Sequence, residues 1–462
     1  MNVPLFLSAF HLHEHRMNLQ PALVYSVLSL STFLKSSNLE DGILGRKKAL
    51  ILRTMAQMSL EQSINCNYIT PGLAQAALIL VLFEVCCHPE HSAYRANSML
   101  QTLDSLIRTL GFLDMDINDP QLTRFRDHTG VVGTSLMART RGSTSPPGLR
   151  VGNAGMGVGG SISGVGSSTL DGGGGCSCTL FKISSTNPTS AKTTPFWLAT
   201  PGWNSSWTLA ETRFEEQRRL VWSAMTLAAA HVSYSNSLGL PPLDLAITKP
   251  WMINVLFPGE TLYRGSNPKL SYDILPGDPS PKDSVWALYA RSQLLFASAA
   301  HVKYSDRLSE KDKAEFAVRA WLETERIEAQ LDVHTCDVEK ATIYHGREYL
   351  FNTQNLVSSQ FTSHVPHPYL GDGSFHRAKA VNWLNHQRHV ANFLFGRLEM
   401  ITGLHHNLLA KRPYFIFWFF GQVARYLNIW QQDNTLIMAL DLAKTLLPPM
   451  EYLMSIYPSE RE

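Results

Sequence analysis

The sequence has few cysteines, no excess of basic residues and no apolar run long enough to span a membrane. Of its 462 residues only six are cysteine, and 40 Lys and Arg nearly balance 38 Asp and Glu, which leaves a formal charge of +2. A balanced charge gives no general attraction to nucleic-acid phosphates. The longest apolar runs, 76–87 and 414–420, fall well short of the roughly 20 residues that span a bilayer. We therefore expect a globular, intracellular chain with no membrane span and no nucleic-acid binding of its own.

Catalytic signatures are missing as well, because the chain has no P-loop, no G-x-S-x-G and no H-E-x-x-H. The stretch GMGVGG at 155–160 does match G-x-G-x-x-G through Gly155, Gly157 and Gly160. A dinucleotide site needs this motif between a strand and a helix, and neither is predicted around this glycine tract. We interpret the match as chance and predict that the chain is not an enzyme and has no catalytic or cofactor-binding residues.

The cysteines do not form a known metal cluster. They are Cys66, Cys86, Cys87, Cys176, Cys178 and Cys336. A binuclear zinc cluster needs six cysteines within about 30 residues, so this spacing excludes it. The tighter group CCHPEH adds His88 and His91 to Cys86 and Cys87. Adjacent cysteines on a helix point about 100° apart, so we favour a buried helix end followed by a polar turn.

Two further patterns fall short of metal sites. His11 and His15 have the spacing of two ligands on a helix, but no third ligand is near. DMDINDP begins like a calcium loop with Asp114, Asp116 and Asn118, yet Asp119 stands where glycine is required and Phe125 where glutamate is required. The sequence therefore predicts no metal site and no cofactor in this chain.

Hydrophobic periodicity predicts helices through most of the chain and sustained strand alternation nowhere. The expected helices are 21–34, 45–64, 71–87, 94–110, 212–235, 284–303, 311–331, 338–363, 375–404, 413–430 and 435–457. Gly, Ser and Thr dominate 142–194, which therefore cannot bury enough surface to offset the entropy of ordering. We predict an all-α fold of stacked antiparallel helices, with an N-terminal part at 1–127, a disordered Gly/Ser-rich insert at 128–195 and a C-terminal part at 196–462. We also predict that 142–194 is dispensable for folding.

The most informative stretch is 214–245, a predicted amphipathic helix that must stop before a Pro-Pro pair. It resembles the fungal-specific transcription factor domain, the middle homology region of fungal binuclear zinc-cluster regulators. The family pattern has paired arginines, an aromatic residue, a long helix, a proline turn and an acidic residue. Here these are Arg218, Arg219, Trp222, Pro241, Pro242 and Asp244.

The resemblance covers most of the chain outside the insert. LQPALVYSVLSLSTF, PGLAQAALILVLFEV and YRANSMLQTLDSLIRTLGF are similar to successive helices of the region, and PPLDLAITKPWMINVLFPGE is similar to the version in mushroom-forming fungi. It implies a nuclear regulatory domain of RNA polymerase II transcription that contacts other transcription-machinery proteins or a metabolite effector, with a homodimer as a further option. Typical members carry an N-terminal zinc cluster that is not in this sequence, so DNA contact and zinc are expected only through a module that this chain lacks. A helical scaffold or interaction protein, or an all-α enzyme, is the alternative.

The resemblance also places the arginine helix centrally, with Trp222 buried. At least one guanidinium must then find an acceptor, because a buried unpaired charge is costly. Glu215, expected on the helix surface, is the local partner. Two interpretations stay open: Arg219 and Asp244 clamp the loop to the helix as a bidentate pair, or both arginines are solvated.

Overall fold

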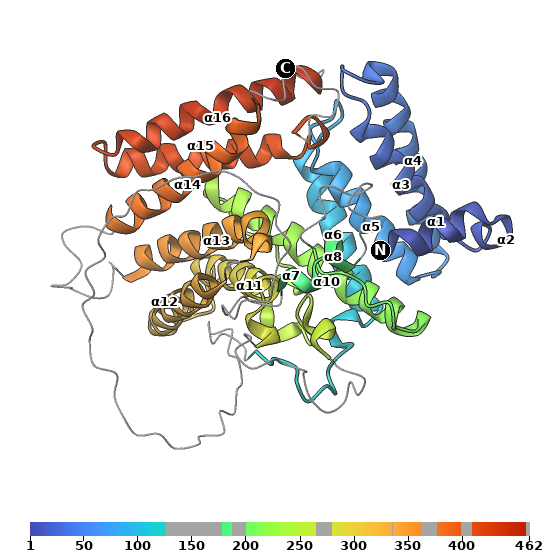
Figure 1. Ribbon diagram of the computed structural model, residues 1–462, viewed down its shortest axis with the longest axis horizontal. Helices are drawn as coiled ribbons and strands as arrows, with labels where there is room; N and C mark the ends of the chain where they lie inside the picture. The colour runs from blue at the N-terminus through green and yellow to red at the C-terminus, as the bar shows by residue number, and fades with distance from the viewer. Residues whose placement is uncertain are drawn as a thin grey trace, which may run out of the picture.

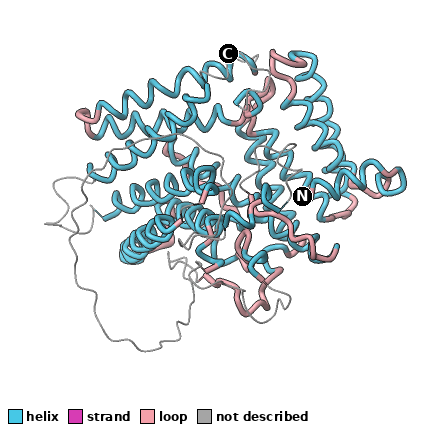
Figure 2. Tube along the Cα trace, viewed as in Figure 1, coloured by secondary structure: helices cyan, strands magenta, loops and turns pink. Residues whose placement is uncertain are grey.

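The computed structural model describes residues 1–125, 178–186, 200–264, 280–334, 336–361, 377–398 and 409–458. Within these ranges the chain is helical, and β-structure is limited to one isolated bridge between Lys182 and Pro201 (Figure 2). The predicted all-α class is confirmed. In this part of the chain no helix is both long and apolar enough to cross a bilayer. The GMGVGG stretch at 155–160 lies outside the described residues.

The helices fall into three groups along the chain. The first is α1 (Val3–His11), α2 (His13–Arg16), α3 (Pro21–Leu34), α4 (Gly42–Asn65), α5 (Pro71–Glu84) and α6 (Ala93–Thr109). Two short helices follow, α7 (Cys178–Phe181) and α8 (Ile183–Thr186). The last group is α10 (Leu209–Ser237), α11 (Val285–Lys303), α12 (Glu310–Val333), α13 (Asp337–Phe361), α14 (Arg377–Leu398), α15 (Phe415–Gln432) and α16 (Ile437–Ile456).

Most of these bounds lie within a few residues of the prediction, because the sequence marks the helix ends. α3 and α5 begin at prolines, and α10 begins after a capping box between Thr208 and Glu211. α5 ends at Glu84, three residues before the expected end, and Val85 is its C-cap. After α6, Gly111 has a φ of 67°, a left-handed conformation that suits glycine and turns the chain into the acidic loop.

Two hydrophobic cores hold together the helices, whose arrangement Figure 1 shows. The first lies around α10, which runs through the middle of the molecule and contacts α5, α6, α11 and α15. The second lies where α14, α15 and α16 cover the ends of α3 and α5. There the backbone N–H of Asn38 donates to the carbonyl of Ile456 at 2.9 Å, and the Tyr457 hydroxyl donates to that of Leu34 at 3.1 Å. Residues before and after the predicted insert thus build the same cores.

The predicted insert is described only at 178–186, and there the prediction is wrong. Cys178 is fully buried in the first core, and the Phe181 ring lies 4.6 Å from the Tyr263 ring, centroid to centroid. The backbone N–H of Gly202 donates to the carbonyl of Phe181 at 2.7 Å. The glycine-rich average of the region concealed single apolar residues such as Cys178 and Phe181, which pack in or against the first core. The remainder of the predicted insert, 128–177 and 187–195, lies outside the described residues.

Candidate functional site

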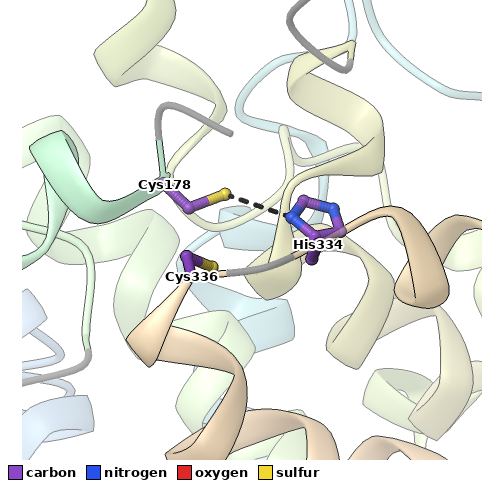
Figure 3. A group of neighbouring side chains, drawn as sticks. All are labelled: Cys178, His334 and Cys336. Carbon is purple, nitrogen blue, oxygen red and sulfur yellow. Dashed lines mark hydrogen bonds between the residues drawn. The ribbon is translucent and has the colours of Figure 1, made fainter. Parts of the chain in front are cut away.

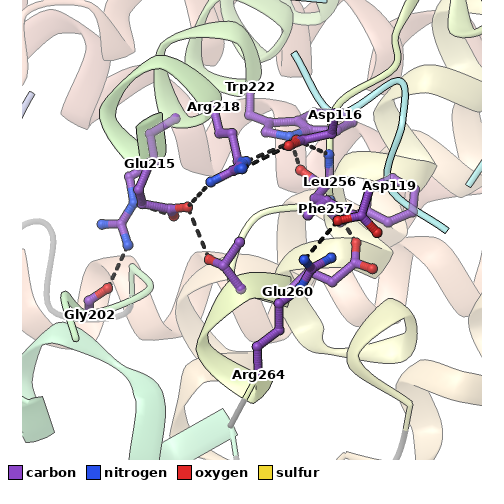
Figure 4. Close-up of polar contacts among 12 residues, drawn as sticks. Asp116, Asp119, Gly202, Glu215, Arg218, Trp222, Leu256, Phe257, Glu260 and Arg264 are labelled. Atoms are coloured by element: carbon purple, nitrogen blue, oxygen red, sulfur yellow. Dashed lines mark hydrogen bonds and ion pairs between the residues drawn. The ribbon is translucent and has the colours of Figure 1, made fainter. Parts of the chain in front are cut away.

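The arginine helix α10 carries the candidate site, which we call the arginine junction: Asp116, Glu215, Arg218, Arg219 and Trp222 with the backbone that they bind (Figure 4). Nε and Nη2 of Arg218 donate to the two oxygens of Asp116 at 2.8 and 2.7 Å. Both side chains are largely buried. Burial opposes the charge of Arg218, but the hydrogen bonds and charge of Asp116 outweigh it, and the pKa of Arg218 is raised. The planar fork of an arginine is well matched to such a bidentate carboxylate.

Asp116 joins three segments of the chain. One of its oxygens also accepts the backbone N–H of Leu256 at 3.0 Å, while its own N–H donates to the carbonyl of Asn254 at 3.0 Å. The indole N–H of Trp222 donates to the carbonyl of Leu256 at 2.7 Å, and its ring packs on Phe257. The acidic loop after α6, the middle of α10 and the 250–257 segment therefore meet at one carboxylate (Figure 4).

Arg219 has a different set of partners. Its Nε donates to Glu215 at 2.9 Å, and its two terminal nitrogens donate to the carbonyls of Pro201 and Gly202. Its guanidinium lies 3.9 Å from the centroid of the Trp203 ring, a cation–π contact. Glu215 also accepts the Thr261 hydroxyl at 3.0 Å. The expected surface position of Glu215 is wrong, because its side chain is 4% exposed, whereas the buried position of Trp222 is confirmed.

The Arg219 to Asp244 clamp is contradicted. Asp244 is 83% exposed and pairs with Lys249 at 2.6 Å, an ion pair that lowers the pKa of Asp244. α10 continues to Ser237 after Arg219, which places the end of the helix about 27 Å away at 1.5 Å per residue. Pro241 and Pro242 follow that distant end and do not enter the arginine junction. The solvated alternative is wrong too, since both guanidinium groups are largely buried and bound to acceptors.

The acidic loop carries the carboxylates that sequence reasoning missed. The sequence of this loop resembles a calcium loop, yet its aspartates bind arginine side chains of the same chain. Asp116 binds Arg218, and Asp119 accepts from Arg264 at 2.7 Å. Asp114 accepts from the Asn254 side chain at 2.7 Å. Paired arginines in a central helix require buried carboxylates, and this loop was the richest source of them. The need of the paired arginines for buried carboxylates was therefore the signal that could have identified these aspartates.

The arrangement favours a structural role. Asp116 and Glu215 are each occupied by arginine donors and by a further hydrogen bond, so neither is placed to take a proton from a bound molecule. A surface hollow of about 310 Å³ lies beside the junction, lined in part by Arg108, Asp114, Trp251 and Asn254. It borders the acidic loop and the 250–257 segment.

Two of the other candidate ligands from the sequence, Cys86 and His91, are in ordinary contacts. The Cys86 thiol lies 3.1 Å from the carbonyl of Leu82, and burial raises the pKa of that thiol. Nδ1 of His91 lies 2.8 Å from the carbonyl of Glu84, and burial lowers the pKa of His91. α1 and α2 are separated at Leu12, so His11 and His15 do not share a helix face.

A second cluster, which we call the thiol junction, was not expected: Cys178, His334 and Cys336 (Figure 3). Their Sγ and ring nitrogen atoms all lie within 4.8 Å of one another. Cys178 begins α7, His334 is the C-cap of α12, and Cys336 directly precedes α13. The close pair His-Thr-Cys was visible in the sequence, but its third member is 156 residues from His334.

Comparison of the chain with protein-family models, with curated protein sequences and with solved structures gave no match.

Proposed function

We propose that this chain is the regulatory domain of a transcription regulator, organised like the middle homology region of fungal zinc-cluster regulators. It acts in the nucleus, on RNA polymerase II transcription, through other proteins of the transcription machinery or a metabolite effector. DNA contact is made by a module outside these 462 residues. In this proposal the helical domain restrains or transmits activation and performs no chemistry.

One observation supports the proposal. Three stretches that carry the resemblance converge on Asp116: the end of α6 with its acidic loop, the paired-arginine helix and the segment after the Pro-Pro turn. Asp116 is 102 positions from Arg218 in the sequence and 140 positions from Leu256. Motifs that belong to one domain are expected to contact one another in the fold, whereas chance similarities would be scattered over it.

The test is a fusion of the whole chain to a heterologous DNA-binding domain, with a reporter controlled by that domain's site. The proposal predicts that reporter output differs from that of the DNA-binding domain alone, upward for an activator and downward for a repressor. Asp116→Ala should lose the effect because it removes the carboxylate at the junction, while Asp244→Ala should keep it. A folded, nuclear fusion that leaves the reporter unchanged would overturn the proposal.

DNA binding by the chain alone provides an independent check. With a formal charge of +2, the chain should bind DNA no better than a neutral protein. A mobility-shift assay at physiological salt measures this. Nanomolar, sequence-selective binding would contradict the assignment of DNA contact to another module.

A specific observation favours the alternative of an interaction protein. Leu44, Ile51 and Met58 stand seven residues apart on α4 and are 75%, 62% and 64% exposed. An apolar row at heptad spacing suits a partner helix, and the same row on a second copy is self-complementary about a two-fold axis. If this surface carries the function, the chain sediments as a dimer and Ile51→Glu makes it monomeric. A wild-type chain that stays monomeric at high concentration would remove this alternative.

A further inference from the structure

We propose that Cys178, His334 and Cys336 form a structural zinc site that fastens α7 to the turn between α12 and α13. Three soft or borderline ligands converge there from different parts of the chain (Figure 3). The site is independent of the proposed regulatory function and differs from the zinc cluster of the family, which uses an N-terminal cysteine module.

The distances between the ligand atoms are close to those of a tetrahedral site. With Zn–S near 2.3 Å and Zn–N near 2.0 Å, a tetrahedral thiolate sulfur and imidazole nitrogen stand about 3.6 Å apart. The Cys178 Sγ and His334 Nδ1 atoms are 3.9 Å apart, and all three ligand atoms lie within 4.8 Å of each other. Side-chain rotations that move the ligand atoms by a few tenths of an ångström to about 1 Å would bring all three within bonding distance of one ion.

The imidazole of His334 is oriented as a ligand. Its Nε2 lies 2.7 Å from the carbonyl oxygen of Asp283, which can only accept, so Nε2 carries the proton. Nδ1 is then the nitrogen of the ring that accepts rather than donates, and it faces the Cys178 thiol. A backbone carbonyl that holds the far nitrogen of a ligating histidine is the usual second partner in protein metal sites.

Burial and charge also fit zinc. Cys178 and His334 are 0% and 3% exposed and Cys336 is 8% exposed, so the ligands are withdrawn from solvent. Zinc binding displaces the two thiol protons to solvent, and two thiolates with one Zn²⁺ and a neutral imidazole carry no net charge. Such a neutral set can be buried at lower cost than a lone thiolate. The Tyr263 hydroxyl, 3.7 Å from the Cys178 sulfur, is placed to donate to that thiolate.

A zinc ion at this site would stabilise the position of α7, which has few contacts of its own to the surrounding core. α7 consists of four residues, too few for a stable helix by itself. Zinc would bind its first residue to both ends of the α12–α13 turn. The fourth coordination position is left to a water molecule or another ligand, and Cys176, two residues before Cys178, lies outside the described residues and is not counted among the ligands.

The first measurement is the metal content of the full chain, purified with zinc and reductant and then passed free of unbound metal. We expect about one zinc per chain, as for a single mononuclear site. Cys178→Ser and Cys336→Ser should each lose the zinc, while Cys66→Ser, which removes an exposed thiol at the end of α4, should retain it. His334→Ala should lose zinc and His334→Cys, which restores a ligand, should recover it. Circular dichroism checks the fold of each variant.

A second measurement does not depend on variants that fold. Cobalt(II) titrated into the reduced wild-type chain should give the intense visible bands of a tetrahedral site and a thiolate-to-cobalt charge-transfer band, and zinc should abolish both. The inference is overturned if the wild-type chain holds no more zinc than the Cys178→Ser, Cys336→Ser double variant, or if cobalt gives only octahedral spectra. A Cys178 to Cys336 disulfide that persists after treatment of the full chain with reductant would overturn it as well, because it leaves no thiolate for zinc.

Discussion

The arginine junction and the thiol junction both join distant segments of the chain, but they use side chains of different chemistry. Each fastens segments that are distant in the sequence: Asp116 and Arg218 are 102 positions apart, and Cys178 and His334 are 156 positions apart. The first uses a guanidinium, whose charge is permanent at physiological pH. The second uses thiols and an imidazole, whose protonation, oxidation and metal binding all change with conditions.

The difference indicates which part of the fold is fixed and which can be adjusted. The arginine junction lies in the middle of α10, against both the acidic loop and the 250–257 segment, and holds the core of the domain. The thiol junction holds α7, a short segment at the margin of the predicted insert. A change of redox state or metal supply would therefore act first on α7, and it would reach the arginine junction through the hydrogen bond of Phe181 with Gly202.

Removal of Asp116 is expected to have the largest effect. Asp116→Ala leaves Arg218 buried without its bidentate partner and Leu256 without an acceptor. The loss should be about 3 to 5 kcal/mol of the free energy of unfolding, typical for one member of a buried pair. Urea denaturation followed by circular dichroism measures it.

Asp244→Ala is the matched control for that experiment. Asp244 is exposed and paired only at the surface with Lys249, so its removal should change the free energy of unfolding by less than about 0.5 kcal/mol. Equal losses for the two variants would mean that the two aspartates are equivalent and that the arginine junction is not central to stability.

A pair of deletions should give the next largest effect. Deletion of 142–176 removes only residues whose composition predicts no core, and the melting temperature should stay nearly unchanged. Extending the deletion to 194 also removes Cys178 and Phe181, which are packed in or against the first core. That deletion should cost about 2 to 4 kcal/mol, the scale of two lost apolar side chains.

Thermal denaturation of the two deletion proteins checks this difference. Equal melting temperatures would show that α7 contributes nothing to the fold and that 142–194 is dispensable as the sequence first predicts. A loss in both proteins would instead assign the effect to residues before Cys178.

A double-mutant cycle between Arg219 and Glu215 should give a smaller but clear coupling. Their hydrogen bond is 2.9 Å long and Glu215 is buried, so we expect a coupling energy of about 1 to 2 kcal/mol. The same cycle between Arg219 and Asp244 should give none, because Asp244 lies beyond the far end of α10. Coupling in the second cycle and none in the first would restore the clamp.

The fold was largely predictable from the sequence because local signals carry it. Helical periodicity, initial prolines and the capping box at Thr208 and Glu211 fix the helices to within a few residues. The sequence did not predict that residues 178–186 are ordered, because the average composition of the surrounding region is typical of disorder. Residues 178–186 lie beside a glycine tract, and only tertiary contacts such as Phe181 with Tyr263 reveal that they are packed.

The candidate sites were predictable only in part, since partners distant in sequence leave no local trace. The need of Arg218 and Arg219 for buried acceptors followed from their place on a central helix, but the identity of Asp116 did not. The expected return of the chain at Pro241 and Pro242 suggested Asp244, but 18 residues of α10 follow Arg219 and place the turn about 27 Å away from it. The thiol junction combines a visible His-Thr-Cys pair with a cysteine from a segment that composition had assigned to disorder.

The smallest expected effect is in the pH dependence of the arginine junction. The pKa of Arg218 is raised in the folded protein, so its contribution is fully present below the pKa of arginine in the unfolded chain, far above neutral pH, and is lost only as the pH rises through the folded value. The difference in unfolding free energy between wild type and Arg218→Met should therefore vary by less than about 0.5 kcal/mol from roughly pH 6 to 9. The difference between wild type and Cys178→Ser, measured with zinc, should fall toward the acid end, because protons compete with zinc for thiolate and imidazole. Denaturant titrations at several pH values measure both differences. A strong slope for Arg218 and none for Cys178 would reverse the assignment of fixed and adjustable junctions.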